Sequence, residues 1–100
     1  MINDFIPNEF SLAGMNFKVE EVDSLKDENE ISLYGQFNNN KCIIYLANNV
    51  DGEQVTTQSK INTFYHELAH ILQYYYNNEL DESFAQCIGN MLMQYNQTRK

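Results

Sequence analysis

The 100-residue sequence predicts a small α+β domain, in which an antiparallel sheet of about three strands precedes two antiparallel helices. Residues 1–50 contain short runs in which apolar and polar residues alternate, and this is the period of β-strands. Residues 54–98 contain apolar residues at intervals of three and four, and this is the period of α-helices. The length is that of one domain, so we expect residues 1–100 to fold as a single unit.

Three segments of the strand-rich half are predicted strands. Residues 15–22 alternate between apolar and polar positions, as a half-buried strand does. Residues 31–37 and 41–47 flank a run of asparagines and predict a β-hairpin, because Asn38–Asn40 tolerate positive φ. Three strands are the smallest number that makes a sheet stable, so we expect the first segment to pack beside the hairpin.

The helical half predicts two helices joined by a short connection. The apolar face of the first helix consists of residues 61, 64, 65, 68, 71, 72 and 75. Thr57 or Ser59 is its expected N-cap, and Asn77–Asn78 its expected end. The apolar stripe of the second helix consists of Phe84, Ile88, Met91 or Leu92, and Tyr95. Because the connection is short, the two helices are expected to pack antiparallel.

The composition argues against several classes of partner. With 14 acidic and 6 basic residues the net charge is −8, which opposes binding to nucleic acid and to an anionic membrane surface. No run reaches the ~18 apolar residues of a membrane span, and the N-terminal residues do not read as a secretion signal. Cys42 and Cys87 lie far apart in the sequence and are predicted to be buried free thiols. These features together predict a cytoplasmic protein.

The most informative motif is FYHELAH at residues 64–70, in the middle of the first predicted helix. Residues four apart lie on one helix face, so His66 and His70 can present their imidazoles to one zinc ion. Glu67 is rotated by about 100° from His66 and is not placed to be a third ligand. It can instead act as a general base toward a water molecule on the metal.

HELAH at 66–70 and DESFA at 81–85 together resemble the gluzincin zinc metallopeptidases. The strand-rich segment before the first helix is similar to the minimal, often phage-encoded members, and the resemblance covers residues 31–95. It implies that Glu82 is the third ligand of a single Zn²⁺. Three protein ligands leave one position for water, as in catalytic zinc sites. The resemblance thus implies hydrolysis of a peptide or protein substrate, with Glu67 as the catalytic base.

Helix geometry leaves alternatives for the third ligand. At 1.5 Å per residue, a first helix that runs through Asn77 would leave Glu82 several Å short of the two histidines. An earlier end would remove most of that mismatch. Asp81 and Glu79 therefore remain substitutes for Glu82. The small residues Ala85 and Gly89 share the Glu82 face and would let the two helices approach closely.

Other groups complete the expected site. Asp81 is the predicted acceptor for a ring N–H of a ligating histidine. The candidates for stabilising an oxyanion are Tyr74, Tyr75, Tyr76 and Tyr95. In the resembling family a strand edge before the active helix binds extended peptide, and residues 42–48 are the expected segment here.

Two other functions are compatible with the sequence. One is a zinc-stabilised binding or regulatory protein that acts through a protein partner without catalysis. The other is an acidic inhibitor of a nucleic-acid-binding protein, in which the histidines hold no metal. Glu67 favours the peptidase over the binding protein, because a purely structural zinc site has no use for a general base.

Overall fold

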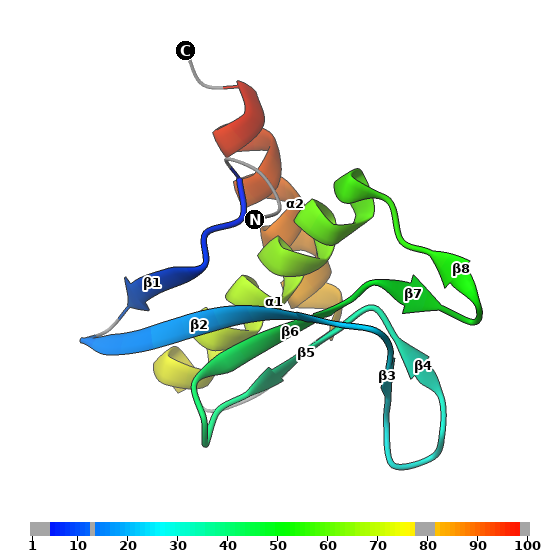
Figure 1. Cartoon of the computed structure of the whole chain (residues 1–100). Helices are drawn as coiled ribbons and strands as arrows, with labels where there is room; N and C mark the ends of the chain where they lie inside the picture. The colour runs from blue at the N-terminus through cyan, green and yellow to red at the C-terminus, as the bar shows by residue number, and fades with distance from the viewer. Residues whose placement is uncertain (1–4, 13, 78–81, 99–100) are drawn as a thin grey trace.

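The structure is a computed structural model that describes residues 5–12, 14–77 and 82–98 (Figure 1). It has the predicted α+β class, with strands followed by two helices. The strands are β1 (Glu9–Leu12), β2 (Met15–Val22), β3 (Leu25–Lys26), β4 (Ser32–Leu33), β5 (Gly35–Asn38), β6 (Ile43–Ala47), β7 (Asn49–Val50) and β8 (Glu53–Gln54). The helices are α1 (Thr57–Asn77) and α2 (Glu82–Thr98).

The main sheet has four strands in the order β1-β2-β6-β5, so the expected sheet of about three antiparallel strands was wrong in number and direction. β1 pairs antiparallel with β2, and β5 pairs antiparallel with β6. β2 and β6 pair in parallel, and this pairing joins the β1–β2 hairpin to the β5–β6 hairpin. The remaining strands form two separate two-stranded ribbons, β3-β4 and β7-β8.

The predicted hairpin is present as β5 and β6, but its first arm is shorter than residues 31–37. Ser32 and Leu33 belong to β4 and pair with β3, away from the main sheet. The positive φ in the turn falls at Cys42, at 56°, and not in the asparagine run. Asn38 instead accepts hydrogen bonds through Oδ1 from the N–H groups of Asn40 and Lys41, each at 3.0 Å. The asparagines therefore fix the turn through a side chain.

Helix α1 begins one residue earlier than an N-cap at Thr57 would place it, and three residues earlier than one at Ser59, so both predicted N-caps were wrong. Thr56 Oγ1 accepts a hydrogen bond from the Ser59 N–H at 3.1 Å, so Thr56 is the N-cap and Thr57 is already helical. The helix continues through Asn77, and Asn78 lies outside the described residues. At its C-terminal end, Leu72 and Tyr75 of the predicted apolar face are exposed.

Helix α1 lies between the main sheet and α2, so the molecule has three layers (Figure 1). The core lies mainly where α1 meets the sheet. It consists of Ile6, Phe17, Ile44, Leu46, Ile61, Phe64, Tyr65 and Ile71. Aromatic contacts such as the stacked pair Phe10–Phe17, with ring centroids 5.3 Å apart, supply much of the packing in a chain without tryptophan. This packing holds α1 at a fixed height above β5 and β6.

Helix α2 approaches α1 through small residues, as predicted. Ala85 and Gly89 are buried, and a Cβ at Gly89 would lie 2.9 Å from the His66 backbone nitrogen. Only glycine allows this backbone approach, because real Cβ contacts are longer. On this helix Leu92 is half-buried and Met91 exposed, while the side chains of Phe84 and Tyr95 are not among those described.

The order of contacts along the two helices agrees with antiparallel packing. Glu82 at the start of α2 meets His70, and Met93, about three turns later, meets Gln58 near the start of α1. Cys87 is exposed on α2 and Cys42 is half-buried, so the expectation of two buried thiols was wrong. Within the described ranges, neither helix is both long and apolar enough to cross a membrane.

Candidate metal centre

Helix α1 brings the two histidines together on one face. The ring centroids of His66 and His70 lie 4.8 Å apart with an interplanar angle of 82°. Glu67 lies beside them, and one ligand atom from each of the three residues falls within 4.8 Å of the others. This group could hold a metal ion.

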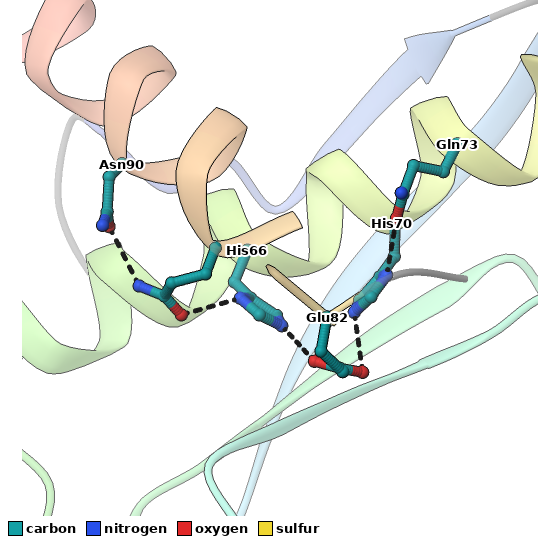
Figure 2. A network of polar contacts seen from close by, with 6 residues as sticks. His66, His70, Gln73, Glu82 and Asn90 are labelled. Atoms are coloured by element: carbon teal, nitrogen blue, oxygen red, sulfur yellow. Dashed lines mark hydrogen bonds and ion pairs between the residues drawn. The ribbon is translucent and has the colours of Figure 1, made fainter. Parts of the chain in front are cut away.

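The first residue of α2 completes the arrangement from the second helix (Figure 2). Glu82 Oε1 lies 2.9 Å from Nε2 of His66, and Glu82 Oε2 lies 3.1 Å from Nε2 of His70. Two imidazole nitrogens from one helix and one carboxylate from its neighbour therefore converge on the same region. The Glu82 side chain is 79% exposed and reaches the histidines from the surface.

The helical rise does not displace Glu82, although α1 runs through Asn77. Glu82 lies 2.9 Å from His66 and 3.1 Å from His70, so the expected mismatch of several Å was wrong. Asp81 and Glu79, the alternatives for the third ligand, lie outside the described residues.

Each histidine also has an oxygen at its other ring nitrogen. Nδ1 of His66 lies 3.1 Å from Oε1 of Gln86, and Nδ1 of His70 lies 3.2 Å from Oε1 of Gln73. The Gln86 amide is oriented in turn, because its Nε2 donates to Asn90 Oδ1 at 3.2 Å. A carbonyl oxygen at Nδ1 selects the tautomer with the proton there and leaves the Nε2 lone pair free.

Sequence reasoning missed both glutamines and named Asp81 for this role, which lies outside the described residues. A signal was present in the helical spacing. Gln73 lies three residues after His70 and Gln86 four after Glu82, so each shares a helix face with a residue of the site.

The two histidines face more hydrogen-bond acceptors than two neutral imidazole rings can donate to. A neutral imidazole carries one N–H, yet each ring here faces an oxygen at both nitrogens. A cation among the two Nε2 atoms and the Glu82 carboxylate would satisfy every group, since each Nδ1–H would donate to its glutamine. The residues present therefore fit a bound metal ion.

The two glutamates of the site have opposite electrostatic environments. Burial raises the pKa of Glu67, the charges of His70 and His66 oppose that rise, and the Glu82 carboxylate adds to it. Burial alone would also raise the pKa of Glu82. There the hydrogen bond with His66 and the charges of His70 and His66 outweigh burial, so the pKa of Glu82 is lowered.

A cleft of about 460 Å³ opens beside these residues. It lies between the segment that leads into β5, the first half of α1 and the start of α2. Its lining residues are Leu33, Tyr34, Gly35, Ser59, Asn62, Thr63, His66, Glu67, Glu82 and Gln86. His66, Glu67 and Glu82 thus adjoin a space that a substrate can enter.

Gly35 sets the distance between the edge strand β5 and α1. A Cβ at this position would collide with the Thr63 side chain and would lie 3.5 Å from Cγ of Glu67. A residue with a side chain would push β5 away from α1. The glycine therefore lets the edge strand lie directly beside the Glu67 turn.

The predicted oxyanion and peptide-binding groups are placed differently from expectation. Among the described residues Tyr74 and Tyr75 do not line the cleft, and the side chains of Tyr76 and Tyr95 lie outside the description. The tyrosine that lines the cleft is Tyr34, which sequence patterns did not indicate. Residues 42–48 contain β6, which is central between β2 and β5, so the edge expected there was wrong. The edge strand beside α1 is β5.

Comparison with protein-family models, with curated proteins and with solved structures gave no match. The resemblance to gluzincins therefore rests on the two sequence motifs. The chemistry of the site has to be argued from its own geometry.

Proposed function

We propose that this protein is a zinc-dependent metallopeptidase, in which His66, His70 and Glu82 hold one Zn²⁺ and Glu67 is the general base. The observation that supports this proposal most strongly is the convergence of two Nε2 atoms and one carboxylate at 2.9 and 3.1 Å. The glutamine oxygen behind each Nδ1 adds to it, because such partners orient metal-ligating histidines.

The donor set supports zinc over harder cations. Two imidazoles with one carboxylate suit zinc, whereas calcium and magnesium prefer oxygen ligands. Ligands 2.0–2.1 Å from one tetrahedral ion lie about 3.3 Å apart, so the observed separations require only a small expansion. When bound, the ion would lower the pKa of a water molecule to about 7 and polarise a substrate carbonyl.

Glu67 has the properties that a general base needs. Its side chain is buried beside the two histidines, and burial raises the pKa of its carboxyl, which strengthens it as a proton acceptor. In the proposed reaction the carboxylate takes a proton from the attacking water. The same carboxyl group then donates that proton to the nitrogen of the departing amine.

The cleft supports an extended peptide as the substrate. β5 is an edge strand, and the segment Leu33–Gly35 that leads into it lines the cleft opposite α1. The unpaired edge of a strand can hydrogen-bond the main chain of a peptide that lies alongside it. A peptide bound in this way would pass over Glu67.

The position of Glu67 favours catalysis over a silent metal-stabilised binding protein. A structural zinc site is closed by four protein ligands, and a buried carboxyl beside it only costs stability. Here Glu67 adjoins an open cleft. In an acidic inhibitor that binds no metal, the contacts of His66 with Gln86 and of His70 with Gln73 would have no function.

The decisive variant is Glu67→Gln, which keeps the shape of the side chain and removes the base. We expect zinc content to remain near one ion per chain while peptide cleavage falls by about 10²–10⁴-fold, the usual contribution of general-base catalysis. Glu53→Gln, at an exposed site on β8, is the matched control and should cleave like the wild type. Cleavage that persists unchanged in Glu67→Gln would remove Glu67 from the mechanism.

A further inference from the structure

We infer that Tyr34 determines specificity, because its ring covers an aromatic or large aliphatic side chain of the substrate beside the scissile bond. This inference rests on the proposed peptidase function and names the substrate feature that the cleft recognises. It follows from the exposure of Tyr34 at the cleft, from its fixed backbone and from its position beside Gly35.

Tyr34 presents an exposed aromatic side chain to the cleft. It is one of the lining residues and is 53% exposed, and its half-buried neighbour Leu33 lines the cleft as well. Contact between water and apolar surface is unfavourable, so a ligand group that covers this surface is stabilised in proportion to the area it covers. Tyr34 and Leu33 thus offer an apolar contact area to a substrate in the cleft.

The backbone of Tyr34 is held between two paired strands. The Ala47 N–H donates a hydrogen bond to the Tyr34 carbonyl oxygen at 2.9 Å, and Ala47 is fully buried in β6. Strand β4 directly before Tyr34 pairs with β3, and Gly35 directly after it pairs with Leu46. The ring therefore projects from a backbone that is fixed before a substrate arrives, which lowers the entropic cost of binding to it.

Tyr34 is also the neighbour of the residue that lies against the proposed general base. A Cβ on Gly35 would lie 3.5 Å from Cγ of Glu67. Consecutive Cα atoms are about 3.8 Å apart, so Tyr34 is one residue from this contact. A peptide that lies along β5 with its scissile bond at Glu67 would therefore place an adjacent residue beside Tyr34.

The opposite wall of the cleft is polar. Helix α1 contributes Ser59, Asn62 and Thr63 to it, and their hydroxyl and amide groups match the main chain of a peptide. An apolar substrate side chain that turned toward α1 would cover these groups without hydrogen bonds, which is costly. The same side chain gains contact area when it turns toward Tyr34, and an aromatic one gains a ring contact in addition.

Three peptides that differ at a single central position test this inference in the zinc-loaded wild-type protein. The position carries phenylalanine, leucine or alanine, and all three peptides have the same blocked ends. We expect kcat/KM to be about tenfold higher for the phenylalanine and leucine peptides than for the alanine peptide, with cleavage at a bond next to this position or one residue away. Equal kcat/KM for the three peptides, or cleavage further from this position, would overturn the inference.

Replacing Tyr34 separates a contact with substrate from a role in the fold. Tyr34→Ala should reduce the preference for phenylalanine over alanine to about twofold, because kcat/KM falls for the phenylalanine peptide and stays nearly unchanged for the alanine peptide. A tyrosine that only supported the fold would slow both peptides by the same factor. Tyr34→Phe should retain the preference, because the ring and not the hydroxyl group makes the contact.

Ile31→Ala is the matched control for these variants. Ile31 is a large apolar residue, 60% exposed, that lies three residues before Tyr34 and outside the cleft lining. Its replacement should leave the preference unchanged. Loss of the preference in Tyr34→Phe, or equal losses in Tyr34→Ala and Ile31→Ala, would contradict the assignment to the Tyr34 ring.

Binding to the zinc-loaded Glu67→Gln variant provides a readout that does not depend on cleavage. Fluorescence anisotropy should show about tenfold tighter binding of the phenylalanine peptide than of the alanine peptide. Adding Tyr34→Ala to this variant should remove most of the difference. The peptides carry identical charges, so loss of the Glu67 charge affects them equally.

These experiments separate this inference from the proposed function. If the wild-type protein cuts none of the peptides while the phenylalanine peptide still binds preferentially through Tyr34, the peptidase proposal fails and the specificity of the cleft stands. If all three peptides are cut and bound alike, the peptidase proposal stands and the inference fails.

Discussion

Exposure distinguishes the roles of the two glutamates at the scale of single residues. Glu67 is 8% exposed beside the histidines, whereas the Glu82 side chain is 79% exposed. A buried carboxyl with a raised pKa is suited to accept a proton. An exposed carboxylate stabilised by two imidazoles is suited to hold a cation. In the proposed mechanism the same residue type would serve two purposes, because helix position gives it two environments.

Gln86 gives the most specific prediction at this scale. Replacing it with alanine removes the oxygen that orients His66, so zinc affinity should fall by about 10–100-fold. The affinity is measured by competition with a chromophoric chelator. Gln94→Ala, at an exposed glutamine two turns further along α2, should leave the affinity unchanged. Equal affinities for the two variants would show that Gln86 does not support the metal site.

At the scale of elements, two glycines set the distances on which the site depends. Gly89 lets α2 touch the backbone of α1 at His66, and Gly35 lets β5 lie against Thr63 and Glu67. Each glycine lets a neighbouring element approach α1 closely. The proposed metal ligands and the cleft depend on that short distance.

A double-mutant cycle tests the contact between β5 and α1. Gly35→Ala should lower the free energy of unfolding by about 1–3 kcal/mol, because the new methyl group collides with Thr63 Cγ2. Thr63→Ser removes that methyl group. The loss should be smaller in the Thr63→Ser background by at least about 0.5 kcal/mol, measured by denaturant unfolding. The same loss in both backgrounds would mean that the Thr63 side chain does not limit the approach.

The helices were predictable and most of the sheet topology was not, for a physical reason. The apolar intervals that define α1, and the spacing of His66 and His70, are local properties that any α-helix obeys. The parallel pairing of β2 with β6 joins segments about 25 residues apart, and neither segment contains a local pattern that predicts this pairing. Gln73 and Gln86 were missed because their helical spacing from His70 and Glu82 is a weak signal, which many glutamines on helices share.

At the scale of the whole molecule, the metal would tie together the two helices of a small domain. The core lies between one face of the sheet and the inner sides of the helices. A domain of this length buries a small core, so we expect its free energy of unfolding to be modest. A metal that binds only the folded state adds its binding free energy to that margin.

Zinc should therefore raise the melting temperature. At a free zinc concentration 100 times the Kd, binding adds about 2.7 kcal/mol, which corresponds to an increase of about 10–20 °C for a domain of this size. Glu82→Ala removes an exposed ligand and should abolish most of this increase while leaving the metal-free melting temperature nearly unchanged. An equal increase in Glu82→Ala would place the zinc elsewhere on the protein.

A crystal structure of the zinc-loaded protein, with anomalous diffraction data on both sides of the zinc absorption edge, tests the central claim most directly. We predict one strong anomalous peak per chain, within bonding distance of Nε2 of His66, Nε2 of His70 and the Glu82 carboxylate, with Glu67 beside it but not bound. A peak at another position, no peak, or two imidazole rings turned away from each other would contradict the account.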